Sequence, residues 1–202
     1  MVDYLLNHWE KLFVALFEHM EIVIITLIIS MVLASILTIL AMYLKVLSKI
    51  LIYVFSVIYS IPSLALFAIM IPVAGLGKVT AILVLIVYNQ YLLLLNFITG
   101  LNEVEPAIVE AGTGIGMTNM QLLFQIRLPL AKKELFTGIR LAVVSTIAIA
   151  TIAASINAGG LGSILFDGLR TMNVFKIAWG SILSVGLALG VNFILQKIEK
   201  AI

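Results

Sequence analysis

The chain has 202 residues, of which 63% are apolar and 11% are charged, with a mean hydropathy of +1.23. Soluble domains are about 45–50% apolar and roughly 25% charged, so this composition excludes an ordinary soluble domain and indicates an integral membrane protein. A formal charge of +2 and the absence of cysteine give no reason to expect a nucleic-acid partner, a disulfide framework or thiolate chemistry.

The first 20 residues have an amphipathic pattern rather than that of a membrane span. Apolar side chains recur at helical spacing, while Glu10, Lys11 and Glu18 fall elsewhere around the helix. We predict an interfacial helix over residues 1–20 that lies on the membrane surface; packing of this segment on another helix is an equal alternative. Both histidines of the chain lie here without a third ligand type, so no metal site is predicted.

Five uncharged runs follow, each close to the ~20 residues that cross a hydrocarbon core of ~30 Å. They predict an all-α integral membrane protein in which residues 21–202 form one transmembrane domain of five spanning helices. The predicted spans are Ile22–Leu44, Ile50–Ile71, Val79–Leu101, Leu141–Ala158 and Ile177–Gln196.

Lysine and arginine in the connecting segments predict the orientation, because cytoplasmic segments carry an excess of these residues. The richer side is therefore predicted to be cytoplasmic, with the N-terminus outside and the C-terminus inside. That side collects Lys45, Lys49, Arg127, Lys132, Lys133, Arg140, Lys197 and Lys200, and the other side collects Lys11, Lys78, Arg170 and Lys176.

The longest interval unsuited to a bilayer, residues 103–133, falls between the third and fourth runs. Pro106 suits the first turn of a helix, where its missing N–H would be unpaired anyway, and Gly116 can supply the left-handed residue that ends this helix. Residues 118–121 match the Thr-x-x-Gln capping box of a second helix, which Pro129 is predicted to stop. Two short helices around a sharp turn predict a cytoplasmic docking element.

None of the five runs contains Asp, Glu, Lys, Arg or His between its ends. Ion-coupled carriers normally keep a buried ionisable residue, because so costly a group survives in the bilayer only for function. Sodium ligands made of hydroxyls and carbonyls leave an ion-coupled carrier or channel open as the alternative. The sequence Gly75-Leu-Gly77-Lys78 has the wrong spacing for a phosphate-binding loop, so ATP would have to be bound by a partner.

Polar residues inside the runs are candidates for a translocation pathway. A proline frees a backbone carbonyl and can kink a helix, and amides at membrane depth either hydrogen-bond across helices or line a polar passage. Helix packing and a pathway role both stay open for each of them. The candidates are Tyr59, Ser60 and Pro62 in the second run and Tyr88, Asn89, Gln90 and Tyr91 in the third.

The docking element resembles the EAA motif of binding-protein-dependent ABC importer permeases: Glu-Ala-Ala, three residues, Gly, nine residues, then Ile-x-Leu-Pro. Glu110-Ala111-Gly112, Gly116 and Ile126-Arg127-Leu128-Pro129 fit this spacing, with Gly112 in place of the second alanine. The wider chain, over roughly residues 20–197, is similar to permeases for glycine betaine, carnitine and choline. The matching stretches are Ser60–Ala65, Gly75–Lys78, Gly112–Thr118 and Ala158–Gly162.

This resemblance implies a type I ABC importer permease fold with a coupling helix within residues 103–130, and a non-catalytic subunit that translocates a quaternary-ammonium osmoprotectant. Another zwitterion such as ergothioneine is the alternative cargo. It also implies residues that couple to the ATPase and residues that touch a binding protein. For Glu110 an ion pair within the chain is the alternative, and for the glycine segment a plain connector is the alternative. The coupling set is Glu110, Ala111, Gly112, Gly116, Ile126, Leu128 and Pro129, and the binding-protein set is Gly159, Gly160 and Gly162.

The resemblance further implies the partners. They are two cytoplasmic ATPases that hold ATP and Mg²⁺, a second permease subunit of the same or similar sequence, an extracellular or periplasmic substrate-binding protein, and the lipid of the cell membrane. No cofactor is expected in this chain itself.

Overall fold

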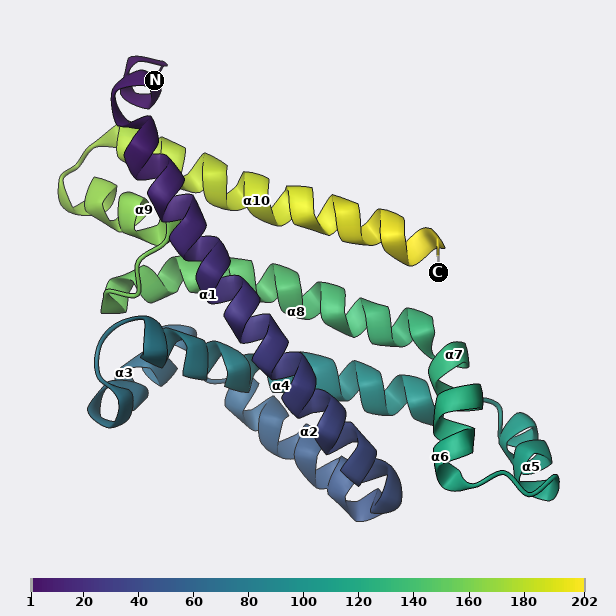
Figure 1. The fold of residues 1–202 in the computed structure, drawn as a ribbon. Helices are drawn as coiled ribbons and strands as arrows, with labels where there is room; N and C mark the ends of the chain where they lie inside the picture. Colours follow the sequence, from purple (N-terminus) through teal and green to yellow (C-terminus); the bar gives the residue numbers. More distant parts are fainter. Residues whose placement is uncertain (1, 202) are drawn as a thin grey trace.

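A computed structural model describes residues 2–201, and every regular element within that range is helical (Figure 1). The elements are α1 Val2–Tyr43, α2 Lys45–Tyr59, α3 Ser63–Ala74, α4 Lys78–Asn102, α5 Pro106–Gly114, α6 Asn119–Gln121, the π-helical segment η1 Leu122–Arg127, α7 Leu128–Leu130, α8 Lys132–Ala153, the 3-10 turn η2 Ala154–Ile156, α9 Leu161–Arg170 and α10 Val174–Ala201.

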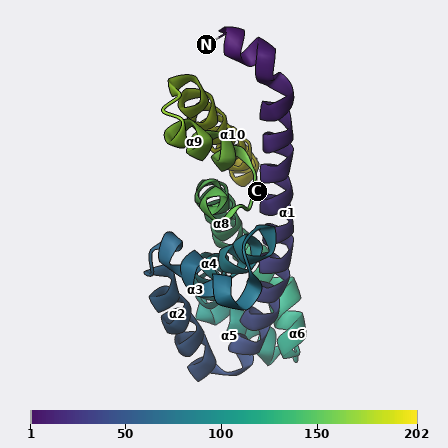
Figure 2. The same ribbon diagram turned by 90° about the vertical axis from the view of Figure 1, so that its left-hand side faces the viewer.

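The long helix α4 lies at the centre of the bundle. It packs on α1, α2, α3 and α8, while α10 packs on α8 and α9. Figure 2 shows α1 running along one side of the layer that contains α4, α8 and α10. The core between these helices is formed by large apolar side chains from α1, α3, α4 and α8, such as Ile22, Phe67, Leu85 and Ile147. In contrast, Gly180 alone is buried among the described residues of α10, so most of this helix is available to lipid or to another subunit.

Within residues 2–201, four helices are long and apolar enough to cross a membrane, and α2 with α3 makes a fifth if the bent pair counts as one span. The all-helical prediction is confirmed, and the third predicted span coincides with α4. The fourth begins earlier than predicted, at Lys132, because its polar residues continue the helix beyond the apolar run. Five spans and the outside position of the N-terminus stay predictions.

The second predicted span is broken at Pro62, where the sequence indicated a kink. α2 ends at Tyr59 and α3 begins at Ser63, and the two helices meet at 99°. Pro62 causes the break, since it has no N–H to continue the helical ladder and its ring clashes with the preceding turn. The hydroxyl of Tyr88 donates a hydrogen bond to the carbonyl of Ile61, so a backbone acceptor at this break is satisfied from α4.

The helix boundary predicted near residue 20 is not observed. α1 has a non-helical residue at His8 (φ −135°, ψ 17°), and from there the helix continues to Tyr43. No glycine or proline interrupts this stretch, and extending an existing helix adds a hydrogen bond for every residue fixed. Residues of the predicted surface helix instead face the chain's own core: Leu12, Ala15 and His19 are 5%, 6% and 0% exposed. The alternative that residues 1–20 pack on another helix therefore fits the face that carries these three residues.

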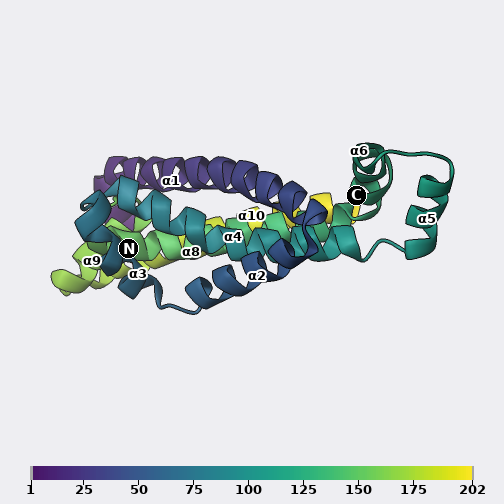
Figure 3. The same cartoon turned by 90° about the horizontal axis from the view of Figure 1, so that it is seen from below.

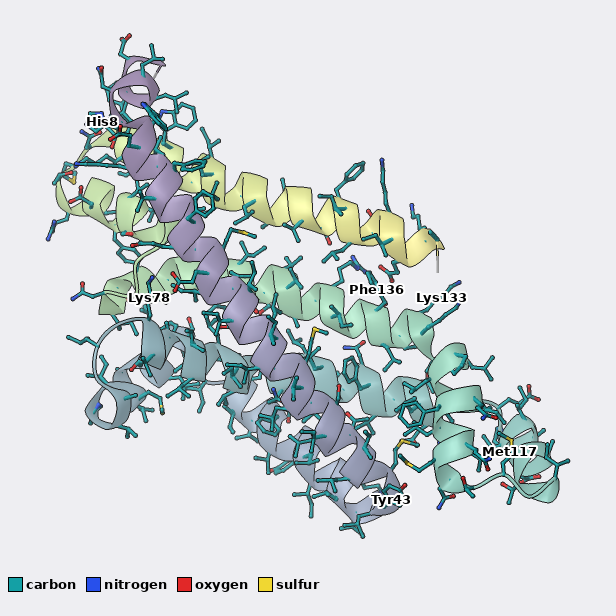
Figure 4. The ribbon with its side chains drawn as sticks, in the orientation of Figure 1. His8, Tyr43, Lys78, Met117, Lys133 and Phe136 are labelled. Carbon is teal, nitrogen blue, oxygen red and sulfur yellow. The ribbon has the colours of Figure 1, made fainter. Side chains whose placement is uncertain are left out.

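The two ends of the bundle differ in shape and charge. In Figure 3 the short helices α5 and α6 project at the end where the C-terminus lies, and α3, α9 and the N-terminus lie at the other end. Figure 4 places Lys133 near the projecting end, and His8 and Lys78 near the opposite one. Lys133 and Lys78, one member of each basic group distinguished in the sequence, thus lie at opposite ends of the fold.

Candidate functional site

The first half of the docking element is α5, which begins at Pro106 as predicted. Its end is a Schellman motif, in which the last carbonyls of a helix accept hydrogen bonds from residues just beyond it. Met117 N–H donates to the carbonyl of Gly112 and Gly116 N–H to that of Thr113, both at 3.0 Å. Gly116 has the predicted positive φ, +86°, which a side chain would disfavour. The sharp glycine turn is confirmed.

The second half is one helical rod of residues 119–130, assembled from α6, η1 and α7. Its capping box is confirmed: Gln121 N–H donates to the Thr118 hydroxyl at 3.3 Å, and Thr118 N–H donates to the Gln121 side chain at 2.8 Å. The prediction that Pro129 stops this helix is wrong, since the helix passes through to Leu130. The preceding turns are π-helical, and this wider winding leaves room for a ring that would clash in an α-helix.

The two halves of the docking element meet at Gly112. A Cβ atom on this residue would lie 2.7 Å from Leu122 Cδ2 and 2.8 Å from Ile126 Cδ1. Gly112 therefore permits close approach of the two halves inside the docking element, and its coupling role stays a prediction. Successive helical residues are 100° apart, so Glu110 lies on nearly the opposite face of α5 from Gly112. Glu110 and Ala111 are exposed.

The other predicted coupling residues divide into two groups. Ile126 and Leu128 pack against an apolar cluster at the end of α4, so they hold the docking element to the bundle. Gly116 and Pro129 are exposed. The cluster consists of Leu101, Val104, Leu123 and Ala131.

The carboxylate of Glu110 is open to solvent. Ion pairs within residues 2–201 join other side chains, at Lys78–Glu21, Arg140–Glu199 and Asp167 with Arg170 and Lys176. Over the same range no hydrogen bond engages the side chain of Glu110 either. The alternative of an intramolecular ion pair for Glu110 is therefore absent from this conformation, and the charge is available to a partner that covers α5.

Asn89 and Gln90 are buried where α1, α4 and α8 meet, at 1% and 0% exposure. The Asn89 amide donates to the Thr146 hydroxyl of α8 at 2.8 Å, and Thr146 in turn donates to the carbonyl of Ala142 at 2.7 Å. The Gln90 amide donates to the carbonyl of Ser30 in α1 at 3.2 Å. These bonds match the helix-packing alternative for both residues. Ser30 and Thr146 were not among the candidates predicted from the sequence, although both are hydroxyl residues inside uncharged runs.

Thr146→Val should weaken this junction measurably. The substitution keeps the shape but removes the nearer of the two hydroxyl acceptors of the Asn89 amide, Thr146 at 2.8 Å and Ser30 at 3.4 Å. Hydrogen bonds between membrane helices contribute about 0.6 kcal/mol on average, with a maximum near 1.7. We expect a loss of about 1 kcal/mol in the free energy of unfolding, measured by denaturant titration in detergent. Thr151→Val is the matched control, because the Thr151 hydroxyl donates within its own helix to the carbonyl of Ile147. Equal losses in both variants would contradict a junction role.

The remaining pathway candidates gather beside the break between α2 and α3. The ring centroids of Tyr59 and Tyr88 are 5.5 Å apart and those of Tyr59 and Tyr91 are 4.9 Å apart. Ser60 and Pro62 lie in the break itself and are exposed. The structure thus brings Tyr59 of α2 against the face of α4 that carries Tyr88 and Tyr91, away from the amides of the neighbouring positions. Their pathway role stays a prediction.

The glycines predicted to touch a binding protein are engaged within the chain. Gly160 N–H donates to the Glu18 carboxylate of α1 at 2.9 Å, and a Cβ on Gly159 would lie 2.6 Å from the same carboxylate oxygen. A Cβ on Gly162 would lie 1.9 Å from the carbonyl oxygen of Thr151. The glycine-rich segment is thus a compact joint followed by α9, and residues beyond it such as Arg170, Thr171 and Met172 are exposed. Contact of the glycines with a binding protein stays a prediction.

A cavity of about 550 Å³ lies at this end between α1 and the α9–α10 turn, with Lys11, Asp167 and Lys176 among its lining residues. Hydrogen bonds from Lys176 (2.6 Å) and from Arg170 (3.0 Å) hold the pKa of the Asp167 carboxyl below its ordinary value of 3.8. Because the pKa of Asp167 is lowered in the folded state, these contacts stabilise the fold at pH values above the ordinary pKa. This stabilisation is lost as the pH falls through the pKa of the folded state.

Lys176→Met should therefore move the pKa of Asp167 back up toward its ordinary value, because the cation that favours the ionised carboxylate is removed. The measurement is a ¹³C NMR titration of the Asp167 carboxyl in detergent micelles. Lys11→Met is the control, since Lys11 lines the same cavity but does not contact Asp167. An unchanged titration in Lys176→Met would contradict the assigned cause.

A family model described as the binding-protein-dependent transport system inner membrane component matches residues 27–202. The chain belongs to this family. It is therefore a permease-type, multi-pass protein of the cell membrane. The docking element lies within the matched region, at the end of the bundle where the C-terminus lies (Figure 3).

Curated relatives and solved structures support the same assignment. The carnitine transport permease protein OpuCB of Listeria monocytogenes is 41% identical over 146 residues, which cover 72% of this chain and 67% of the relative. The choline transport system permease protein OpuBB of Bacillus subtilis is 32% identical over 200 residues, which cover 99% of this chain and 92% of the relative. A chain of the MetNI methionine ABC transporter, solved in inward-facing conformations, has a TM-score of 0.85 at 20% identity over 96% of this chain and 97% of that one, which shows a shared fold.

Proposed function

We propose that the chain is the membrane subunit of an ATP-driven importer and that ATPase subunits dock on α5. The observation that carries the proposal is the exposed, unpaired Glu110 on a short helix that projects from the bundle (Figure 3). The family supports the general role, since its description is that of the inner membrane component of binding-protein-dependent transport systems. The chain has no phosphate-binding loop, so hydrolysis of ATP belongs to the partner.

In this mechanism two ATPases bind the docking elements of two permease subunits. Closure of the ATPases around ATP moves both elements as rigid bodies, because the Schellman turn and capping box fix the angle between the two halves. The docking end faces the cytoplasm, as the excess of lysine and arginine there predicts. The second subunit, of the same or similar sequence, covers part of the apolar surface that α10 leaves open. A binding protein delivers the substrate at the opposite end.

The proposed cargo is a quaternary-ammonium osmoprotectant such as carnitine, choline or glycine betaine. Two relatives carry the names of carnitine and choline permeases and share 41% and 32% identity with the chain. The cluster of Tyr59, Tyr88 and Tyr91 supports this class, because an aromatic ring face attracts a cation that cannot donate hydrogen bonds. Competition between unlabelled ergothioneine and a labelled osmoprotectant for uptake would distinguish this other zwitterion as the cargo.

The test is uptake by the complete transporter, with its ATPases and binding protein, reconstituted in lipid vesicles. Radiolabelled choline, carnitine and glycine betaine are offered outside, with ATP either enclosed or omitted. We expect accumulation that requires ATP and the binding protein and that survives ionophores which collapse ion gradients. Uptake that persists without ATP and disappears with the ionophores would instead establish an ion-coupled carrier.

A further inference from the structure

The docking element is tied to the bundle by one charged hydrogen bond. Arg127, in the last turn of η1, donates from Nη1 to the carbonyl oxygen of Leu101 at 2.9 Å. Leu101 lies in the last turn of α4, where carbonyls have no donor within the helix and carry the negative end of the helix dipole. The guanidinium therefore caps the C-terminal end of α4 from a helix 26 residues further along the chain.

The surroundings of this bond are apolar on one side and open on the other. Leu101 and Leu123 are 2% and 3% exposed, so the carbonyl lies against the apolar cluster at the base of the docking element. Arg127 also lines a cavity of about 240 Å³ between the ends of α1 and α4 and the start of the docking element, together with Tyr43 and Asn102. The guanidinium thus borders open space on one side, while its hydrogen bond joins the docking element to the end of α4.

α4 is the helix through which such a movement would reach the membrane interior. It packs on four other helices of the bundle. It carries Asn89, bonded to α8, and Gln90, bonded to α1. It also carries Tyr88, whose hydroxyl holds the break between α2 and α3. A displacement of its C-terminal end would thus act on both groups of polar residues at membrane depth.

We propose that Arg127 is a positioning residue that couples the docking element to α4, so that movement imposed on α5 by an ATPase pulls on the end of α4. The inference rests on the proposed function. Arg127 does not lie on the exposed face of α5 with Glu110, and its contribution is made within the chain. Arginine suits this task because its guanidinium is planar, permanently charged and presents several donors in a preorganised fork.

The test uses the complete transporter in vesicles and measures substrate transported per ATP hydrolysed. We expect Arg127→Met to assemble with its ATPases and hydrolyse ATP, while transport per ATP falls about ten-fold, within the range of coupling between distant sites. Arg127→Lys keeps the charge but not the fork, so an intermediate ratio is expected. Lys132→Met is the control, since Lys132 is an exposed cation at the same end of the fold and is expected to leave the ratio unchanged.

Two results would overturn the inference. One is a wild-type ratio of transport to hydrolysis in Arg127→Met. The other is loss of the ATPases from the purified complex in both Arg127→Met and Arg127→Lys, which would make Arg127 a purely structural support of the docking surface. If the wild-type transporter itself shows no ATP-dependent uptake, the proposed function fails. This outcome differs from the two results that would overturn the inference about Arg127.

Discussion

Glu110→Arg is expected to abolish most ATP-driven uptake while leaving the membrane domain folded. The Glu110 side chain is exposed and has no ion pair within residues 2–201, so its replacement removes no contact inside the chain. In the complex, a reversed charge at a docking surface costs several kcal/mol where it meets a like charge, so we expect uptake to fall by about a hundred-fold. The measurement is ATP-dependent uptake in vesicles, together with recovery of the ATPases on the purified permease.

Gly112 requires a separate experiment, because its substitution acts inside the docking element. A side chain at Gly112 would press on Leu122 and Ile126, so Gly112→Val changes the angle between the two halves rather than the docking face. Gly114→Ala is the matched control within α5, since a Cβ there meets nothing within 4 Å.

For the Glu110→Arg prediction, wild-type uptake with the ATPases still bound would show that Glu110 is not part of the docking surface.

Gly162→Ala is expected to destabilise the fold strongly for the addition of a single methyl group. The new Cβ would lie 1.9 Å from the carbonyl oxygen of Thr151 and 2.8 Å from the Cβ of Ala154. A backbone carbonyl cannot turn away as a flexible side chain can, so the joint between α8 and α9 must move apart. Overpacking of this kind costs about 1–3 kcal/mol and occasionally more, and we place Gly162→Ala at the upper end.

Thermal unfolding followed by size-exclusion chromatography in detergent measures this effect. Gly186→Ala is the matched control in α10, because a Cβ there meets nothing within 4 Å. Alanine is favoured over glycine by about 0.5–1 kcal/mol inside a helix, so the control is expected to be neutral or slightly stabilising. Equal melting temperatures for Gly162→Ala and the wild type would show that the joint is looser than the contacts indicate.

The docking element was predictable because its signals are short-range. Pro106 at a helix start, Gly116 in a left-handed turn and the capping box at residues 118–121 each act over a few residues, and all three are observed. The helical class and the long apolar segments were predictable for a similar reason, since hydropathy adds up along the chain. Pro129 was misjudged, because the π-helical turn before it was not foreseen.

The errors elsewhere arise where packing decides. A proline at position 62 indicates a kink, but the angle of 99° between α2 and α3 depends on their contacts with α4 and α8. Likewise, the glycines at positions 159, 160 and 162 indicate a loop as long as the side chain that contacts them is unknown. Here the partner is Glu18, which accepts the N–H of Gly160 from a helix 142 residues away in the sequence.

Hydropathy, proline, glycine and capping residues act locally, so the sequence predicts a helical membrane protein with two short helices around a sharp turn between its third and fourth apolar runs. Tertiary structure alone decided that Asn89 and Gln90 join helices, that Gly112 faces inward and that Glu110 is open to a partner. It also decided that Arg127 caps α4. These features depend on how the helices cross. Crossing brings together Arg127 and Leu101, 26 residues apart, and Gln90 and Ser30, 60 residues apart, and no local pattern encodes that geometry.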